Sequence, residues 1–267
     1  MSTSAANTDP DVREDVVLYV IQGSHACRCA TLMLAHKAIS FRRVVLPTGV
    51  HPLLVRALGF AGHAEPIRSV GGHTHRSLAL LDRLGTVPAL RYGRERVQTN
   101  RAIARFLDRI RPDPPLLPAD AEQRLAVEAA ERWGDEDFQM AARRLALTGA
   151  LHGLDTFRHR GGDGRLGALL AENETLRAIN GQIAARAIFR ADAQAERALL
   201  DELPAMLNRI DASIADGVLD GPQLNVADFL IAPSLALIAY RLDLRAQVEA
   251  RPAGVLLQRV LPEPAPD

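Results

Sequence analysis

The stretch Val16-Val17-Leu18-Tyr19-Val20-Ile21-Gln22-Gly23-Ser24-His25-Ala26-Cys27 contains the pattern that decides the fold. Its first half is apolar and mostly β-branched, which predicts a buried strand. Gln22 and Gly23 indicate a turn, and Gly23 gives the backbone the freedom to enter a helix that starts near Ser24 or His25. Apolar residues at helical spacing continue this helix to Lys37.

The next segments complete a small sheet. A second strand is predicted over Phe41–Leu46, and a strand–helix–strand unit of this kind implies a parallel pair covered by a helix. Val87–Tyr92 and Glu95–Gln98 flank a tight turn and predict an antiparallel pair. Asn100–Ile110 is amphipathic and predicts a helix. In between, residues 48–85 predict helices at His51–Leu58 and Arg76–Leu84 around a loop rich in Gly and His, which we interpret as a lid or as an insertion.

The second half of the chain has no strand pattern. Asp113–Pro118 is rich in proline and predicts a linker. Helices are predicted over Ala121–Ala150, Leu166–Arg190 and Ala193–Asp216. A mixed sheet with attached helices beside a separate helical part fits this order. The expected core positions of the helical part are Leu125, Ala129, Trp133, Phe138, Leu199, Leu203, Leu207, Ile210 and Ile214.

We therefore expect a leader without fixed structure at residues 1–15, an α/β domain at 16–111, a linker at 112–120, an all-α domain at 121–258 and a tail at 259–267. The leader is polar and acidic, so it does not resemble a secretory signal, and no run of about 20 apolar residues predicts a membrane-spanning helix.

The charge balance points away from nucleic acid and membranes as partners. The 32 basic and 32 acidic residues give a formal net charge of zero, so no surplus of positive charge would drive counterion release. The chain has 2 cysteines, Cys27 and Cys29, which are too close in sequence to join distant segments. A reducing, cytoplasmic location is expected.

Three motifs occur together along the chain. Ser24-His25-Ala26-Cys27 lies where a strand passes into a helix, and Thr86-Val87-Pro88 directly precedes a strand. In Leu224-Asn225-Val226-Ala227-Asp228-Phe229-Leu230-Ile231-Ala232-Pro233, Asn225 and Asp228 are spaced for a capping box, and Leu224 and Phe229 for a hydrophobic staple.

Together these motifs resemble the cytosolic glutathione S-transferase superfamily, and in particular its uncharacterised bacterial serine-type relatives. The Trp133–Glu136 and Arg251–Gly254 segments add to the resemblance, which spans about Val16 to Leu257. It implies a thioredoxin-like N-terminal domain with a mixed βαβ-ββα arrangement and an all-α C-terminal helical domain. It also implies a cis peptide bond before Pro88.

The resemblance assigns roles to single residues. Ser24 occupies the place of the catalytic serine, whose hydroxyl and helix N-terminus stabilise a thiolate. The alternative is that Ser24 only caps the helix. Val87 would pair through its backbone with the cysteinyl part of glutathione, and Pro88 would fix that geometry. Thr99 and Asn100 occupy the γ-glutamyl positions, with Gln98 as a substitute, but Thr99 brings no charge to the ammonium group.

His25 and Cys27 complete the candidate binding residues. His25 could act as a base on Ser24, although the sequence offers no partner to orient it. Cys27 and Cys29 are interpreted as core residues, because side chains two positions apart on a helix diverge and cannot form an unstrained disulfide. We expect no metal site: His51, His63, His73 and His75 have no spaced carboxylate or cysteine beside them. Asp135, Glu136 and Asp137 are interpreted as a solvated helix face.

The leading hypothesis is a glutathione transferase-like enzyme that directs a bound thiolate at a small electrophile, with glutathione as co-substrate and no metal. The resemblance further implies a homodimer with a role in detoxification. Two alternatives stay open: a non-catalytic binding protein of the same fold, and a transferase for another thiol such as mycothiol. Lys37 is the only lysine in an arginine-rich chain, which indicates a GC-rich genome, and such organisms do not all use the same thiol.

Overall fold

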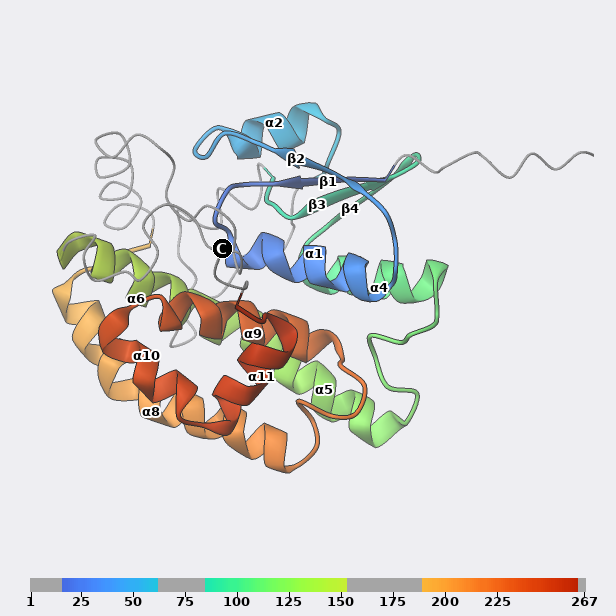
Figure 1. Cartoon of the computed structure of the whole chain (residues 1–267). Helices are drawn as coiled ribbons and strands as arrows, with labels where there is room; N and C mark the ends of the chain where they lie inside the picture. Colours follow the sequence, from blue (N-terminus) through green and yellow to red (C-terminus); the bar gives the residue numbers. More distant parts are fainter. Residues whose placement is uncertain (1–15, 62–84, 153–188, 264–267) are drawn as a thin grey trace, which may run out of the picture.

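A four-stranded mixed sheet forms the first part of the computed structural model, which describes residues 16–61, 85–152 and 189–263 (Figure 1). The strand order is β2-β1-β3-β4. The strands span Val16–Val20 (β1), Arg42–Val45 (β2), Ala89–Tyr92 (β3) and Glu95–Gln98 (β4). β1 is parallel to β2 and antiparallel to β3, and β3 is antiparallel to β4. The predicted thioredoxin-like arrangement is confirmed.

Helices cover both faces of this sheet. α1 (His25–His36) and α4 (Asn100–Ile110) lie on the face toward the helical part, and α2 (His51–Ala57) lies on the other face (Figure 1). β1 is buried along its whole length because it is a central strand with helices above and below. β2 is an edge strand and is mostly exposed.

The second part contains only helices in the residues that the structure describes. They are α5 (Ala121–Trp133), a π-helix (Gly134–Phe138), α6 (Gln139–His152), α8 (Ala193–Ala215), α9 (Val226–Ala239), α10 (Leu242–Glu249) and α11 (Pro252–Val260). The predicted mixture of an α/β part and an all-helical part is therefore confirmed.

α9 is the centre of the helical part. All of its residues are buried, and it packs against α1, α5, α6, α10 and α11. Asn225 and Asp228 form the predicted capping box at its start: the Asn225 N–H donates to Asp228 Oδ2 at 2.8 Å, and Asn225 Oδ1 accepts from the Ala227 N–H at 2.9 Å. When the N–H groups of the first turn have hydrogen-bond acceptors, an apolar helix can be buried without the free-energy cost of unpaired amides.

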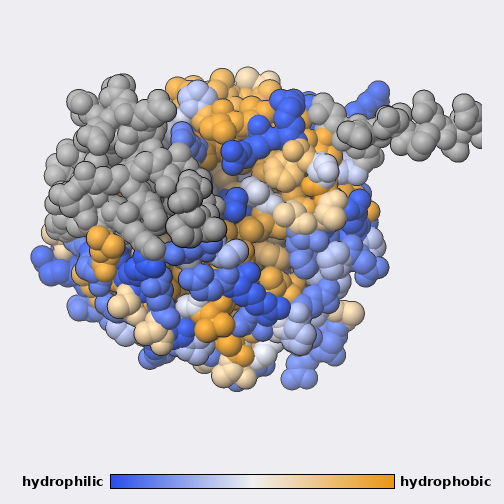
Figure 2. Space-filling view, in the orientation of Figure 1, coloured by the Kyte–Doolittle hydropathy of each residue, from blue (hydrophilic) through white to orange (hydrophobic). Residues whose placement is uncertain are grey.

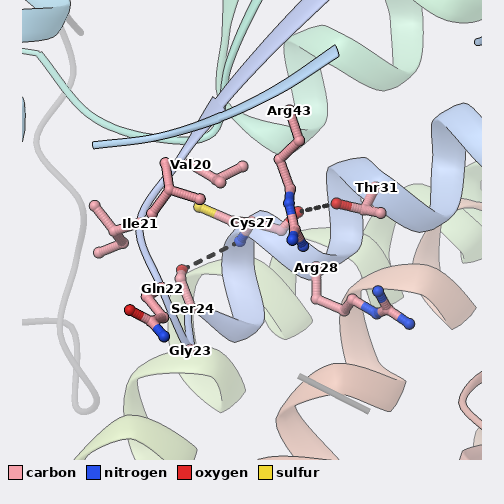
Figure 3. Close-up of a pocket in the computed structure, with 10 residues that line it drawn as sticks. Val20, Ile21, Gln22, Gly23, Ser24, Cys27, Arg28, Thr31 and Arg43 are labelled. Carbon is pink, nitrogen blue, oxygen red and sulfur yellow. Dashed lines mark hydrogen bonds between the residues drawn. The ribbon is translucent and has the colours of Figure 1, made fainter. Parts of the chain in front are cut away.

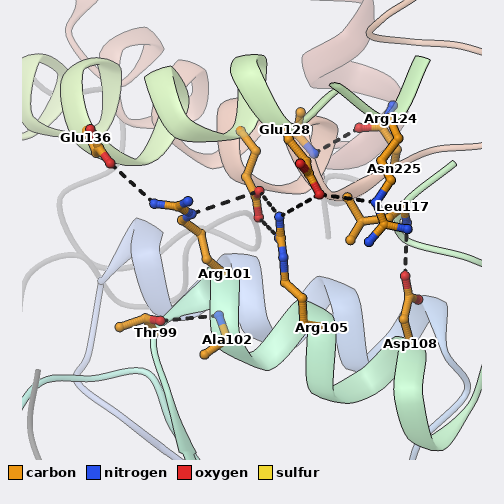
Figure 4. Close-up of polar contacts among 12 residues, drawn as sticks. Thr99, Arg101, Ala102, Arg105, Asp108, Leu117, Arg124, Glu128, Glu136 and Asn225 are labelled. Atoms are coloured by element: carbon orange, nitrogen blue, oxygen red, sulfur yellow. Dashed lines mark hydrogen bonds and ion pairs between the residues drawn. The ribbon is translucent and has the colours of Figure 1, made fainter. Parts of the chain in front are cut away.

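Ion pairs join α4 to α5 and to the π-helix (Figure 4). Glu131 is fully buried and accepts from both Nη atoms of Arg105, while Arg101 pairs with Glu136 at 3.3 Å. Asp108 accepts the N–H groups of Leu116 and Leu117 at 2.9 and 3.0 Å. These contacts fix the sheet part against the helical part.

Two predicted core positions are wrong. Leu125 is 68% exposed and Ala129 is also exposed, because α5 turns Val127, Ala130 and Glu131 inward instead. The other expected core positions are buried or partly buried: Trp133, Phe138, Leu199, Leu203, Leu207, Ile210 and Ile214.

Several expectations lie outside the described residues. These are the leader, the helices at Arg76–Leu84 and, except for its last two residues, Leu166–Arg190, and the positions of His63, His73 and His75. Within the described part, α2 confirms the helix expected at His51–Leu58. Hydrophobic side chains reach the surface at the top of Figure 2, over α2, where Val50, Leu53, Leu54 and Leu58 are exposed. No described helix is long and apolar enough to cross a membrane.

Candidate functional site

The strand register brings three segments of the chain to one edge of the sheet. Tyr19 pairs with Ala89, and Ala89 pairs with Gln98, so the end of β1, the start of β3 and the end of β4 lie in one row. Each segment continues at this edge: β1 leads to the start of α1, Val87 and Pro88 precede β3, and β4 leads to the start of α4. Adjacent strands lie about 4.8 Å apart, so these segments are close neighbours.

Ser24 is the N-cap residue of α1. Its backbone is extended, and its Oγ accepts the N–H of Cys27 at 3.2 Å. Gly23 supplies the positive φ of 67° that turns the chain into the helix. Because the Ser24 oxygen only accepts in this bond, the hydroxyl hydrogen can be donated to a ligand. Ser24 is half-buried.

Val87 and Pro88 are buried, and the peptide bond between them is cis, as the resemblance implies. They are tied to the end of β4. The N–H of Thr99 donates to the Pro88 carbonyl at 3.3 Å, and Gln98 Nε2 donates to the Thr86 carbonyl at 2.9 Å. The structure therefore brings Val87, Pro88, Gln98 and Thr99 together.

Thr99 has a backbone conformation that threonine rarely adopts, with φ of 71° and ψ of 148°. It caps α4 by accepting the Ala102 N–H at 3.3 Å. Strained residues of this kind cluster at binding and catalytic sites. Asn100 follows as the first residue of α4 and is 3% exposed, and its Oδ1 has no hydrogen-bond partner among the described residues. An unpaired buried amide oxygen is costly, so this position is suited to a ligand that satisfies it.

A cavity of about 370 Å³ opens beside Ser24, between the start of α1 and the edge strand β2 (Figure 3). Val87, Gln98, Thr99 and Asn100 do not line it. Ser24 and Cys27 do, together with Val20, Ile21, Gln22, Gly23, Arg28, Thr31, Arg43 and Val45.

His25 is not part of this cavity. It is 3% exposed, and its Nε2 lies 3.3 Å from the Gln139 carbonyl of α6. Burial, and then the charge of Arg143, lower the pKa of His25 to about 3. The side chain is therefore a neutral contact to the helical part, and the structure shows no hydrogen bond between it and Ser24.

The cysteines diverge from each other as expected. Both are free and buried, and burial raises the pKa of each thiol. The Cys27 thiol lies at the cavity wall, whereas Cys29 Sγ donates to the His25 carbonyl at 3.2 Å and faces α9. A buried, protonated thiol is a poor nucleophile, so neither cysteine has the properties of an attacking group.

Asp135 is a charged residue that sequence reasoning placed wrongly on a solvated face. It lies in the π-helix and is only partly exposed, and burial raises its pKa to about 6. The π-helix is the reason: it changes the helical phase after Trp133, and no sequence pattern predicts it. The sequence also did not predict that Arg28 and Arg43 line the cavity, because their positions there depend on how α1 packs beside β2. The described residues contain no cluster of metal-ligating side chains.

No known family model matches the sequence, and no curated protein matches it either. Solved structures do match. A GST-like protein from Pseudomonas syringae is 16% identical with a TM-score of 0.55 over 92% of this chain, and this chain spans 66% of that protein's length, just under two thirds. Poplar glutathione transferase F1 is 12% identical with a TM-score of 0.58, and the match covers 92% of each chain.

The chain has the glutathione transferase fold. A third match, a glutathione S-transferase from Methylobacterium radiotolerans in complex with glutathione sulfonate, is 17% identical with a TM-score of 0.50 and covers 92% of this chain and 90% of that one. At such identities the likeness shows the fold alone, and residue roles have to be argued from this chain's own geometry.

Proposed function

We propose that the chain is a glutathione transferase-like enzyme that stabilises a bound thiolate for attack on a small electrophile. The observation that supports this proposal most strongly is the geometry of Ser24. Its hydroxyl lies at the N-terminus of α1 with its oxygen already accepting the Cys27 N–H. The hydroxyl hydrogen and the positive end of the helix are then both available to a sulfur anion.

The thiolate is the reactive form, so lowering the thiol pKa raises the attacking fraction at neutral pH. A free thiol has a pKa of about 8.5, and each unit of lowering corresponds to about 1.4 kcal/mol of preference for the anion. A charge-assisted hydrogen bond and a helix N-terminus are together sufficient for a shift of about 1–2 units. Cys27 does not compete for this role because its thiol is buried and protonated.

The edge of the sheet supplies the remaining contacts for a peptide-like thiol. The backbone of Val87 would pair with the cysteinyl part, with Pro88 holding the segment. Asn100 would bind the γ-glutamyl end, where its unpaired Oδ1 is suited to an ammonium group and its amide NH₂ and the α4 N-terminus are suited to a carboxylate. Gln98 and Thr99 position this segment through the bonds described above. Glutathione has both groups, and one match was solved with a glutathione analogue.

Thr99 favours two further candidates. Its side chain is neutral, so the ammonium group meets no carboxylate at this position, and glutathione would bind weakly. A different small thiol without this ammonium group would not be weakened by the missing carboxylate. A non-catalytic protein of the same fold is the other candidate, in which Ser24 acts only as a cap. We further expect a cytoplasmic homodimer with a role in detoxification.

Calorimetric titration tests the proposal. Glutathione or mycothiol should bind the wild-type protein, and the same thiol should be conjugated to a standard electrophile such as a chlorodinitrobenzene. Thiol binding without conjugation to any electrophile would favour the non-catalytic candidate, and the absence of both would contradict the proposal.

A further inference from the structure

The cavity beside Ser24 is a groove between one face of α1 and one face of β2. Ser24, Cys27, Arg28 and Thr31 follow the helical spacing that places side chains on a single face, and they form its first wall. Arg43 and Val45 are two positions apart on β2 and therefore point to the same side of the sheet. Figure 3 shows Arg43 extending from β2 toward the first turns of α1, near Thr31 and Arg28.

Among the described residues, the charged side chains that line this groove are arginines. Arg28 and Arg43 line it, and none of the lining residues that the structure describes carries a carboxylate. Arg43 is exposed and forms no ion pair or hydrogen bond with any residue that the structure describes. The Arg43 guanidinium therefore gives this groove a positive charge that attracts and orients anions.

The groove also has an apolar side. Val20, Ile21 and Val45 line it, and Val45 is 51% exposed. The volume of about 370 Å³ lies within the range of small-molecule sites, about 300–1,000 Å³. The lining is therefore suited to a compact molecule with an oxyanion at one end and an apolar body at the other.

We propose that this groove is a second small-molecule site, which binds the oxyanion of an amphiphilic acid through Arg43. A planar guanidinium donates two parallel hydrogen bonds to a carboxylate or a phosphate, and lysine cannot reproduce this geometry. The apolar body lies against Ile21 and Val45. The site lies on the β2 side of Ser24, opposite Val87 and Asn100, so acid binding does not require the thiol.

Phenyl phosphate and benzoate are suitable probes, with phenol as the neutral control and inorganic phosphate as the control without an apolar body. Calorimetric titrations would use the wild-type protein, Arg43→Gln and Arg42→Gln, all without thiol. Arg42 is the matched control because it is an exposed neighbour on β2 that points to the other face. Unchanged melting temperatures of the free variants would show that both remain folded.

We expect saturable binding of at least one acid to the wild-type protein and to Arg42→Gln, about tenfold weaker binding to Arg43→Gln, and none of phenol. Phenyl phosphate binding without benzoate binding would identify a phosphate site, and the reverse a carboxylate site. Equal affinities of the two variants, or no saturable binding of either acid, would overturn the inference. A separate glutathione titration keeps this outcome distinct from a failure of the thiol proposal.

Discussion

The backbone N–H of Thr99 donates to the carbonyl of Pro88 at 3.3 Å, and this bond joins the segment before β3 to the start of α4. Thr99 holds a positive φ of 71° while it does so. The Val87 backbone and the Asn100 side chain are therefore carried by one hydrogen-bonded unit at the edge of the sheet. Contacts to a peptide-like thiol at these two positions would be made or lost together.

A carboxylate at position 99 should strengthen glutathione binding. Thr99→Glu supplies a negatively charged partner for the ammonium group of glutathione. A half-exposed ion pair contributes up to about 1 kcal/mol, or about fivefold in affinity. Calorimetric titration measures the gain. Thr99→Gln has the same length without the charge, and an equal gain in this variant would contradict the electrostatic explanation.

Two substitutions of Ser24 separate capping from catalysis. Ser24→Ala removes both roles and should cost about 1 kcal/mol of unfolding free energy together with most of the conjugating activity. Ser24→Asp still caps α1, so its stability should stay near that of the wild type, but its carboxylate repels a thiolate and activity should be lost. Urea unfolding and conjugation rates measure the two effects. Full activity in Ser24→Asp would leave Ser24 with a capping role alone.

Acid should destabilise the protein through His25. The pKa is about 3 in the folded state and about 6.5 in the unfolded state. Between these values the unfolded state binds more protons, so stability rises with pH through this window and is lost as the pH falls. From pH 7 to pH 5 the loss attributable to His25 is about 2 kcal/mol.

The variant His25→Gln should remove most of this pH dependence, since an amide can still donate to the Gln139 carbonyl but does not titrate in this range. His51→Gln is the control, because His51 is only partly buried. Urea unfolding at several pH values measures the effect. Parallel curves for wild type and His25→Gln would show that another group is responsible.

The ion pair between α4 and α5 should matter because one partner is fully buried. Glu131→Gln leaves Arg105 without its bidentate carboxylate, and we expect a loss of about 2 kcal/mol, reduced from the cost of a fully buried pair because Arg105 is one-third exposed. Glu128→Gln, whose carboxylate lies 3.6 Å from the same arginine and is 31% exposed, should cost no more than about 0.5 kcal/mol. Similar losses in both variants would contradict this ranking.

Local signals were sufficient to predict most of the fold. β1 was predicted because a buried strand reads as a continuous apolar run, and α9 because Asn225 and Asp228 mark its start. Val87, Thr99 and Ser24 were assigned to one site by the resemblance to glutathione transferases, and the strand register brings their segments to one edge of the sheet.

The features that the sequence did not predict depend on packing between segments, which no local sequence pattern encodes. Leu125 and Ala129 occupy plausible core positions, but the burial of Glu131 against Arg105 sets which face of α5 turns inward. The π-helix shifts the helical phase and brings Asp135 to a partly buried position, where burial raises its pKa. The groove near Arg43 requires two elements that are separate in sequence, so neither segment predicts it.

The pKa of the bound thiol tests the central claim most directly. Ultraviolet difference spectra of the thiolate, recorded across pH with glutathione or mycothiol bound, would be compared for the wild-type protein and Ser24→Ala. The account predicts a bound-thiol pKa about 1–2 units below that of the free thiol, which returns toward the free value in Ser24→Ala. A bound thiol with the same pKa in both proteins, or no binding of any small thiol, would contradict it.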